Sequence, residues 1–584
     1  MKRILLISLA LFAVLAHLQA IPAQRTSVKV TQPDGTTLFV QLVGDEYLHY
    51  HITNDGYTIV RNDDGYFVYA QIDSEGELVP TSQVAHDAEA RTSAETVFLA
   101  KIQKHLKPKM TSRKVVEKQN ERMRRQKAFE KRRSNRYDYS KFKGLVVLVE
   151  FKDKGFDTEN YKDIITDMIT KEDFTGYYNY NNRRVACTGS VFDYFRDNSM
   201  GVFKPQFDIV GPVKIDHSQY DPKGTDSVAV ITAAAIDTVD ETVNFKDYDT
   251  DKDGVVDMVY FIFAGHGSHV NGNNKGLIWP HASELYRYDE GTGFYYYINK
   301  DGVRLSRYAC STELQGGETS RDIDGIGTIC HEFSHVLGLP DFYDTDGKDS
   351  GGQSNDPDKW TLMSQGCYLN NARTPAGYSL FERYMVGWTT PEAIEEEGTY
   401  SLERLNQSNK GYRINTPVRK EFFILENRQK QRWDTYLPGH GLLVFRVDST
   451  KASVWANNTV NANPKHNYYE LVRAGGTTKS AIYDPFPGNG RVRTLNNTTT
   501  PANLLTWSGK ETQFGLLNIT EKSGVITFDI EDTNTPPETD QIVTLESQTK
   551  SVNSAVYDLQ GRKILATKLP KGIYIVDGRK IVVP

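Results

Sequence analysis

Apolar and polar residues alternate along the first part of the chain, from about residue 27 to residue 84. The alternation has a period of two, which is that of a β-strand with one buried face. It is interrupted by Asp-Gly pairs that begin at positions 34, 55 and 64. Such pairs are typical of tight turns between paired strands. The pattern therefore predicts a β-rich N-terminal unit built from hairpins.

From Gly144 the pattern changes to one in which strands and helices follow each other. An uninterrupted apolar run at 145–151 is typical of a strand that is buried on both faces. The periodicity predicts further strands near 207–213 and 255–264, and helices near 190–198 and 226–239. This succession predicts an α/β unit in which helices cover a sheet. Beyond Trp388 the pattern becomes β-rich again, with strands expected near 421–426, 442–447 and 525–530.

The N-terminus has the three-part form of a secretory signal peptide. Lys2 and Arg3 precede an apolar run at 4–16, and Ala20 ends a short segment that suits cleavage. The run is too short to span a bilayer comfortably, and no later stretch is apolar enough to do so. The sequence therefore predicts an exported protein without a transmembrane segment.

From residue 94 to residue 136 the pattern predicts a helix that is very basic, so the charge of the chain is unevenly distributed. The formal net charge is −6, yet residues 101–136 contain 15 Lys or Arg against three Glu. Phe129 is the one Phe, Tyr or Trp in this segment, so the segment lacks the regularly interleaved aromatics that would favour nucleic-acid binding. Lys131, Arg132 and Arg133 lie just before the apolar strand at 145–151, where an activating protease with a preference for basic residues could cut. We therefore predict that residues 21–136 are a removable propeptide.

The four cysteines, Cys187, Cys310, Cys330 and Cys367, all lie in the central part of the chain. In an exported protein they could form two disulfides, with three possible connectivities. A small buried thiol at Cys330 is an equally good interpretation. No cysteine lies between residues 21 and 140, so a propeptide thiolate does not block a metal in this chain.

The segment from His331 to Asp341 carries the strongest chemical pattern. On a helix His331 and His335 share one face, where two imidazoles can bind one Zn²⁺. Glu332 lies beside them and can act as a general base on water. Gly338 permits a left-handed turn that ends the helix and brings Asp341 round as a third ligand. The pattern predicts a zinc hydrolase site with one open position.

The segment has two other interpretations. The helix could be an ordinary amphipathic one whose histidines are satisfied in the core. The β-rich regions could also make the chain a surface adhesin or glycan-binding protein with a structural zinc. A structural zinc site is normally closed by four protein ligands and does not need a neighbouring Glu, so the sequence favours the hydrolase.

Residues beyond the motif add to this prediction. Met363 lies in an expected turn about thirty residues after His331 and could form an apolar floor under the metal. Tyr368 or Tyr343 could donate a hydrogen bond to the oxyanion of the reaction. The segment 278–281 could form the edge strand along which a substrate pairs. His266, His269 and His281 are interpreted as cleft or structural residues, because the motif already supplies three ligands.

An acidic loop precedes the strand predicted at 255–264. Asp249, Asp251 and Asp253 stand at alternate positions, followed by Gly254 and, at the ninth position, Asp257. This matches the first nine places of a calcium-binding loop. The twelfth position is Tyr260 in place of the usual bidentate Glu, so another oxygen, such as that of Asp247, would have to complete the site. The loop predicts a structural Ca²⁺ ion.

These features together resemble a known group of peptidases. The extended zinc motif, the Asp341 ligand and the Met363 turn are similar to those of the metzincin clan. Within it, the sequence from Gly338 to Asp344 resembles that of the immune-inhibitor-A-like bacterial metallopeptidases. Further resembling stretches lie at 191–199, 264–267, 278–281, 426–429 and 437–444, so the resemblance covers roughly residues 140 to 450.

The resemblance implies an extracellular zinc endopeptidase that acts on protein substrates, is made as a zymogen and uses calcium to support its fold. It implies an α/β metzincin-like catalytic domain with a β-rich propeptide before it and β-rich domains after it. Because the propeptide lacks cysteine, an Asp carboxylate of residues 21–136 is the expected blocking group, as in related zymogens.

The C-terminus resembles a different family. The stretches 556–563 and 571–583 are similar to the C-terminal sorting domains of the type IX secretion system. The resemblance implies a bacterial protein that depends on this secretion machinery and is secreted or attached to the outer surface. A plain hairpin that closes the fold is the other interpretation.

The predicted organisation has six parts: a signal peptide (1–20), a propeptide (21–136), a zinc metallopeptidase domain (137–390), a β-rich C-terminal domain (391–532), a linker (533–541) and a sorting-like segment (542–584).

Overall fold

The computed structural model describes residues 19–20, 27–44, 49–62, 64–74, 76–108, 141–219, 228–269, 277–289, 294–316, 319–345, 352–533, 543–544, 556–557, 563–564, 572–576 and 579–583. The predicted signal peptide up to residue 18, most of the basic segment and nearly all of the predicted linker lie outside these residues.

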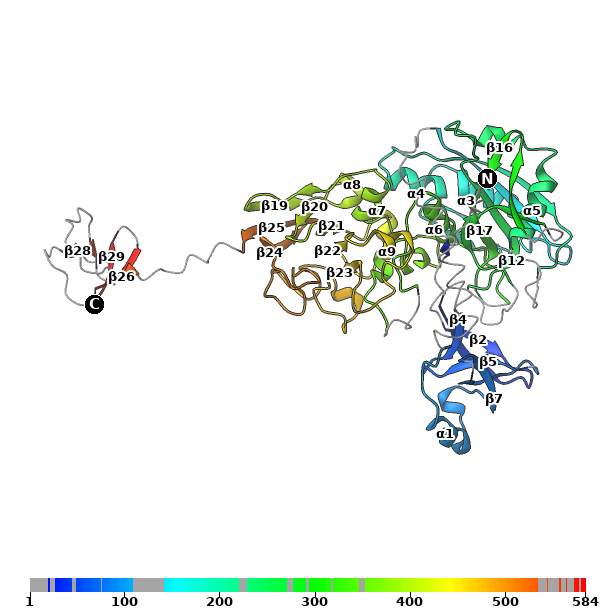
Figure 1. Cartoon of the computed structure of the whole chain (residues 1–584), viewed down its shortest axis with the longest axis horizontal. Coiled ribbons are helices and arrows are strands. Elements are labelled where there is room, and N and C mark those ends of the chain that lie inside the picture. Colours follow the sequence, from blue (N-terminus) through cyan, green and yellow to red (C-terminus); the bar gives the residue numbers. More distant parts are fainter. Residues whose placement is uncertain are drawn as a thin grey trace, which may run out of the picture.

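The central sheet, of which Figure 1 labels β12 and β17, has six strands in the order β1-β13-β17-β12-β8-β11. Four neighbouring strands are parallel: β17 (Arg307–Leu314), β12 (Val259–His266), β8 (Lys143–Glu150) and β11 (Gln206–Lys214). At one edge β13 (His281–Glu284) runs antiparallel to β17, and β1 (Gln19–Ala20) runs antiparallel to β13. The prediction of a mixed α/β unit is confirmed.

Both faces of the central sheet are buried, which explains the uninterrupted apolar run of β8. Leu145 and Val147 pack in one apolar cluster with α5 (Val228–Val239). Val146 and Leu148 point to the opposite face and pack in a second cluster, which includes residues of α6 (Ile326–Val336). Successive strand residues point to opposite faces, so a strand covered on both sides must be apolar at every position.

The second cluster also holds α3 (Tyr161–Thr170) and α4 (Val191–Asn198). α4 begins with a capping box, in which the Ser190 hydroxyl accepts a hydrogen bond from the Asp193 amide and the Asp193 carboxylate accepts one from the Ser190 amide. This cap fixes the start of the helix, as the pattern at 190–198 predicts. The helices give α6 a rigid platform.

Two further sheets form the β-rich part of the chain. One contains β18 (Glu392–Ala393), β20 (Tyr412–Asn415), β21 (Glu421–Arg428), β22 (Gly441–Asp448) and β23 (Tyr469–Leu471). The other contains β19 (Gly398–Leu402), β25 (Val525–Asp532) and β24 (Phe514–Lys522). The strands predicted near 421–426, 442–447 and 525–530 are therefore confirmed.

The apolar core continues across the boundary predicted at residue 390. On β21, Phe423 and Leu425 pack between the two β-rich sheets. Phe422 and Ile424 point the other way and pack in the same cluster as α6. The face of the β-rich sheet is thus part of the core that surrounds the predicted zinc helix.

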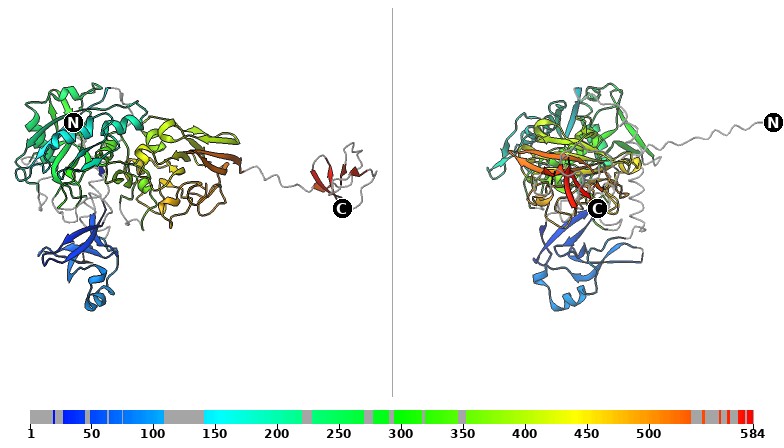
Figure 2. Two further views of the ribbon diagram at one scale, coloured as in Figure 1. Left: turned by 180° about the vertical axis from the view of Figure 1, so that it is seen from behind. Right: turned by 90° about the vertical axis from the view of Figure 1, so that its left-hand side faces the viewer.

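The N-terminal unit is a six-stranded antiparallel sheet in chain order, as its hairpin pattern predicts. Its strands are β2 (Val28–Thr31), β3 (Thr37–Gly44), β4 (His49–Thr53), β5 (Thr58–Arg61), β6 (Phe67–Ile72) and β7 (Leu78–Val84), followed by α1 (Ser93–Leu99). Leu42 of β3 packs in the apolar cluster that contains α6. Figure 2 shows this unit on one side of the central part.

Smaller elements complete the described chain. They are β9 (Gly176–Tyr178), β10 (Arg184–Ala186), β14 (Tyr286–Asp289), β15 (Phe294–Lys300), β16 (Val303–Leu305), α7 (Leu380–Met385), α8 (Leu405–Ser408) and α9 (Ala452–Ala456). Near the C-terminus β26 (Val543–Thr544), β27 (Val556–Tyr557), β28 (Lys563–Ile564), β29 (Gly572–Val576) and β30 (Arg579–Val583) form a separate five-stranded sheet.

Two predicted elements differ from the observed ones. The helix expected from residue 94 ends at Leu99, because the chain folds back and the His105 amide donates to Gly56 O, 2.8 Å away. The strand expected from residue 255 begins at Val259. The Val256 and Asp257 amides donate to Arg304 O and Tyr248 O, so this segment pairs outside the central sheet.

All four cysteines are free thiols. Cys310, Cys330 and Cys367 are buried, and Cys187 is half-buried. The structure therefore contains neither of the two possible disulfides. Cys330 is a small buried thiol, which was the alternative prediction. Within the described residues, no helix has both the length and the apolar character needed to cross a membrane.

A buried arginine joins the β-rich part of the chain to the α/β part. Arg428 pairs with Glu426, 3.1 Å away, and with Asp434. It also donates to Trp360 O at 3.1 Å and to Gly377 O at 2.9 Å. Both ion pairs are excluded from solvent, so each charge depends on its partner.

We expect Arg428→Met to lower the free energy of unfolding by about 3–5 kcal/mol, because it leaves two buried carboxylates without their cation. Urea denaturation measures this change. The matched control is Lys171→Met, which removes the cation of the solvent-exposed pair with Asp167 and should cost about 1 kcal/mol or less. Equal effects of the two substitutions would contradict the importance given to the buried pairs.

Candidate metal centre

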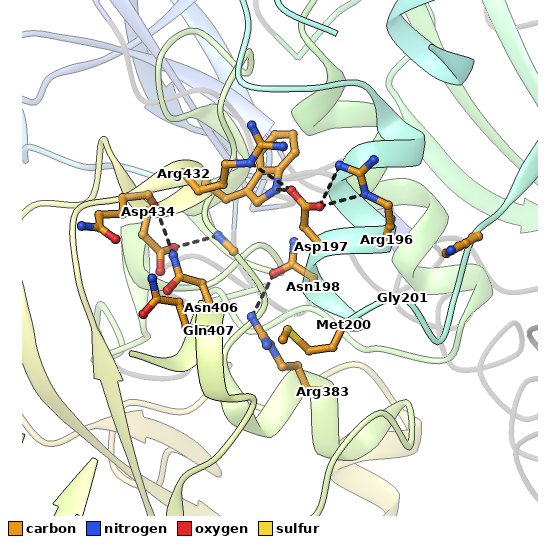
Figure 3. Close-up of a pocket in the computed structure, with 14 residues that line it drawn as sticks. Arg196, Asp197, Asn198, Met200, Gly201, Arg383, Asn406, Gln407, Arg432 and Asp434 are labelled. Carbon is orange, nitrogen blue, oxygen red and sulfur yellow. Dashed lines mark hydrogen bonds and ion pairs between the residues drawn. The ribbon is translucent and has the colours of Figure 1, made fainter. Parts of the chain in front are cut away.

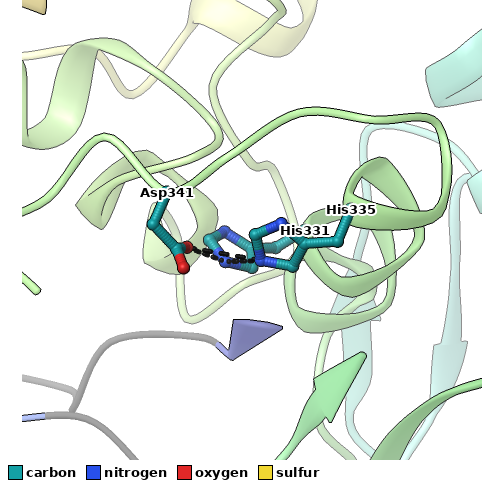
Figure 4. Close-up of side chains that lie close together, drawn as sticks. All are labelled: His331, His335 and Asp341. Carbon is teal, nitrogen blue, oxygen red and sulfur yellow. Dashed lines mark hydrogen bonds and ion pairs between the residues drawn. The ribbon is translucent and has the colours of Figure 1, made fainter. Parts of the chain in front are cut away.

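The two histidines of the motif lie one turn apart on α6 and face each other (Figure 4). Both are fully buried. The Nε2 atoms of His331 and His335 are 3.2 Å apart. A four-residue spacing on a helix brings side chains to the same face, so this arrangement follows from the local sequence.

Hydrogen bonds fix the orientation of both rings. The Nδ1 atom of His331 lies 2.9 Å from Leu362 O, and that of His335 lies 2.8 Å from Leu339 O. A carbonyl oxygen can only accept, so each Nδ1 carries the proton and each Nε2 presents its lone pair. Burial also lowers the pKa of His331 below its ordinary value. The neutral ring with a free Nε2 is the form that binds a metal.

The end of α6 has the hydrogen bonds of a Schellman motif. Gly338 has φ +101°, its amide donates to His335 O, and the Leu339 amide donates to Ser334 O. A side chain at position 338 would strain this left-handed backbone. The turn reverses the chain and brings Asp341 back toward the histidines.

Asp341 completes a compact group of three ligand atoms. Its Oδ1 lies 3.1 Å from His331 Nε2 and 3.3 Å from His335 Nε2. Burial alone would favour the neutral acid, but the neighbouring His335 and His331 hold the pKa of Asp341 well below its ordinary value. The carboxylate is therefore ionised and available as a ligand.

The separations within this group suit a zinc ion. Zinc bonds of about 2.0–2.1 Å in tetrahedral geometry place neighbouring ligand atoms about 3.3 Å apart. The three observed separations are 3.1, 3.2 and 3.3 Å. Of the groups of His, Cys, Asp and Glu that could hold a metal among the described residues, this is the buried one.

The turn that contains Met363 is hydrogen-bonded to the loop that carries Asp341. Met363 is fully buried, and its carbonyl accepts a hydrogen bond of 2.7 Å from the Phe342 amide. Its own amide donates to Glu382 Oε1 at 3.1 Å. Burial raises the pKa of Glu382 to about 7. The turn thus contacts the loop that carries Asp341, while Leu362 beside it orients His331.

The proposed general base Glu332 and the two candidate tyrosines, Tyr368 and Tyr343, all lie close to the ligands in sequence or in space. Glu332 is fully buried on α6, and its charge acts on the phenol of Tyr368, whose pKa burial raises well above its ordinary value. Tyr343 is only 2% exposed and lies in the loop after Asp341.

The other histidines stay outside the group of ligand atoms. His266 contacts Ser320 O at 3.0 Å, and His281 contacts the Tyr308 hydroxyl at 2.6 Å. His269 is buried beside Tyr368, and its Nε2 lies 4.0 Å from Asp324. Burial lowers the pKa of His269 to about 3 and raises that of Asp324 to about 7, because it disfavours the charged form of each group.

The acidic loop brings three of its four predicted calcium ligands together. Asp249, Asp251 and Asp253 form a group whose carboxylate oxygens lie within 4.8 Å of one another. Gly254 has φ +84°, which gives the sharp turn expected of such a loop. Asp257 lies outside this group, and its carboxylate accepts hydrogen bonds from the amide and hydroxyl of Thr250. Asp247 accepts one from Asn244.

A separate cavity of about 610 Å³ lies between α4, α7, α8 and the turn Arg432–Asp434 (Figure 3). None of the predicted metal ligands lines it. Asp197 pairs there with Arg196 at 3.0 Å and with Arg432 at 3.2 Å. One carboxylate there thus pairs with two guanidinium groups. The cavity is thus distinct from the metal centre.

Two residues that hold the candidate metal centre in place could not be predicted from the sequence pattern. Glu382 anchors the Met363 turn, and Asn458 forms hydrogen bonds with Asp341 from 117 residues further along the chain. The sequence offers no spacing that links either residue to the motif. Their roles depend on contacts between distant segments.

The family comparison bears on the same segment. Residues 130–389 match the family model described as "Immune inhibitor A peptidase M6, catalytic domain". The chain therefore carries a peptidase M6 domain. This match supports the predicted metallopeptidase and the resemblance to immune inhibitor A, and a metallopeptidase family implies a bound metal.

Two kinds of relative share sequence with this chain. Immune inhibitor A of Bacillus thuringiensis subsp. alesti is 24% identical over 351 residues, which is 48% of this chain and 47% of that protein. The pre-pro-metalloprotease PrtV of Vibrio cholerae serotype O1 is 31% identical over 147 residues, which is 22% of this chain and 15% of PrtV. The chain thus spans less than half the length of either relative.

The M6 domain contains the predicted ligands, Glu332, Met363 and the acidic loop. Arg428 and Asn458 lie beyond its last matched residue. The contacts of these two residues show that segments outside the M6 match pack directly against it.

Proposed function

We propose that this chain is a zinc-dependent endopeptidase that hydrolyses protein substrates. The observation that carries the proposal is the buried group of His331, His335 and Asp341, whose separations suit zinc and whose ring orientations leave both Nε2 atoms facing it. The M6 match and the metalloprotease among the relatives support the same conclusion. The metzincin resemblance of the motif agrees with it.

In the proposed reaction, His331, His335 and Asp341 would hold zinc, which would supply a Lewis acid for the attacking water and the scissile carbonyl. Glu332 follows the first ligand in sequence and takes the proton from water, then passes it to the leaving amine. Tyr368 donates a hydrogen bond to the oxygen of the former carbonyl as negative charge develops there. The Gly338 turn and the Met363 turn keep the ligands in place throughout.

The substrate is proposed to bind as an extended strand along β13. This strand lies near the edge of the sheet, and the described chain itself pairs with it: Gln19 lies opposite Ala282, and Ala20 lies opposite His281, in antiparallel register. An edge that accepts one extended segment offers the same main-chain groups to a peptide. The segment predicted for this role overlaps β13 at His281.

We expect Glu332→Gln to lower kcat by about 10²–10⁴-fold, because the amide cannot accept the proton while the side chain keeps its size. Casein hydrolysis measures the activity, and metal analysis measures bound zinc, which should remain at one ion per chain. Glu395→Gln, at an exposed position, is the matched control and should keep full activity.

Retained proteolysis by Glu332→Gln with zinc bound would refute the proposed role of Glu332. Zymography with and without a chelator tests the enzyme class as well. Loss of the clear zone with the chelator and its return on adding Zn²⁺ are expected, whereas a zone that the chelator does not affect would refute zinc dependence.

We also propose that the acidic loop binds a structural Ca²⁺. Oxygen donors from Asp249, Asp251 and Asp253 converge at the turn of Gly254, and hard carboxylate oxygens are the ligands that calcium prefers. The loop immediately precedes β12 of the central sheet. Calcium would thus stabilise the start of a strand that lies beside β8.

In zinc-containing buffer, adding Ca²⁺ should raise the melting temperature, since an ion at about 100 times its Kd stabilises the folded state by about 2.7 kcal/mol. The double substitution Asp249→Asn and Asp251→Asn should abolish this increase. Asp216→Asn, at an exposed carboxylate outside the loop, should leave it unchanged. A wild-type melting curve that Ca²⁺ does not shift would refute the site.

We propose further that residues 21–136 are a propeptide and that residues 542–584 direct export by the type IX system. The packing of Leu42 in the cluster around α6 supports a propeptide that sits on the catalytic core, and the relative PrtV is described as a pre-pro-enzyme. The separate C-terminal sheet supports a unit that the secretion machinery could recognise.

In a bacterium with a type IX system, the protein recovered from the medium or the outer surface should have an N-terminus beyond Arg136. Deleting residues 542–584 should retain the protein inside the outer membrane. N-terminal sequencing and cell fractionation measure these outcomes. An active form that begins near Ile21 would refute the propeptide, and unchanged location of the deletion variant would refute the sorting role.

A further inference from the structure

The two oxygens of the Asp341 carboxylate have different partners. Oδ1 faces the two imidazoles, at 3.1 and 3.3 Å. Oδ2 accepts a hydrogen bond of 2.5 Å from the side-chain Nδ2 of Asn458. The Asp341 amide in turn donates to Asn458 Oδ1 at 2.6 Å. One carboxamide therefore holds both the backbone and the side chain of Asp341.

Asn458 is well suited to this task. It is only 3% exposed, so water does not compete for its two hydrogen bonds. Its φ is +46°, a left-handed conformation that Asn tolerates better than most residues. An amide group has one donor end and one acceptor end, which match the carboxylate oxygen and the backbone N–H of Asp341.

The contact extends beyond one residue. The Thr345 hydroxyl donates to Asn458 O at 3.1 Å, and Asn461 Nδ2 donates to Phe342 O at 2.7 Å. We call residues 458–461 the clamp segment. It lies between α9 and β23, and it binds the loop from Asp341 to Thr345 at several points. The loop that carries the third ligand is thus attached to the β-rich part of the chain.

We propose that Asn458 is a positioning residue of the metal centre, which makes the region beyond the M6 match a required part of it. The inference rests on the proposed zinc site. By binding Oδ2, Asn458 leaves Oδ1 as the oxygen directed at the metal. By binding the Asp341 amide, it fixes the distance of the carboxylate from α6. A free carboxylate would rotate and present either oxygen.

Partners of metal ligands commonly contribute 10–100-fold to metal affinity. We therefore expect loss of the Asn458 hydrogen bonds to weaken zinc binding by about this factor. A residue that served only the fold would instead lower stability and leave the affinity of the folded protein for zinc unchanged. Metal affinity is thus the measurement that separates the two roles.

Two substitutions test the clamp in the full-length chain. Asn458→Asp keeps the size of the side chain but replaces the donor with an oxygen that repels Asp341 Oδ2. Asn458→Gly removes both hydrogen bonds without backbone strain, since glycine adopts a positive φ readily. Asn457→Asp and Asn457→Gly, at the neighbouring half-buried position, are the matched controls.

Zinc affinity is measured by competition with a chromophoric chelator, and ligand geometry by the visible absorption of the Co²⁺-substituted protein. Both Asn458 variants should bind zinc about 10–100-fold more weakly than wild type and show an altered Co²⁺ spectrum, while both Asn457 variants match wild type. At saturating zinc, the Asn458 variants should have a lower kcat and an unchanged KM.

Asp341→Ala is measured in parallel. Asn458 variants that bind zinc as tightly as wild type, while Asp341→Ala binds it weakly, would overturn the clamp and leave the zinc site intact. Asn458 variants that melt at lower temperature with unchanged affinity and spectrum would overturn it as well. Unchanged affinity in Asp341→Ala would refute the proposed ligand set itself.

Discussion

Two imidazoles and a carboxylate are held within 3.3 Å of one another, and all three side chains are buried. Such a group has little freedom, because each side chain must be oriented before a metal can bind all three. The surrounding structure meets this constraint from several directions. Leu362 O and Leu339 O fix the rings, the Schellman turn at Gly338 returns the chain, and the Met363 turn supports the loop.

The parts of this centre that sequence could predict are the local ones. His331, His335, Gly338 and Asp341 lie within eleven residues, so helix geometry and one turn decide how they meet. Asn458 could not be found in this way, because its contact with Asp341 joins segments 117 residues apart and depends on how a β-rich sheet packs. The acidic loop shows both cases: its three alternate aspartates converge, while Asp257 turns to Thr250.

In the fold, as in the candidate metal centre, the sequence predicts local features but not contacts between distant segments. Alternation and apolar runs predicted the hairpins of the N-terminal sheet and the strand β8, because these patterns report which faces are buried. The predicted start of β12 was wrong, because the Val256 amide donates to Arg304 O. No local pattern of apolar and polar residues reports this contact between distant segments. The apolar faces of β21 belong to two clusters, so the core continues where the change of pattern near residue 390 predicted a boundary.

The position of the clamp segment in the chain bears on the order of events during synthesis. A ribosome that has completed the M6 match has made both histidines and Asp341, but not Asn458 or Asn461. Synthesis proceeds from the N-terminus, so these partners of the Asp341 loop emerge only after about seventy more residues have been added. The nascent chain thus has the three proposed ligands before it has the groups that hold Asp341, so the proposed metal centre would be completed late.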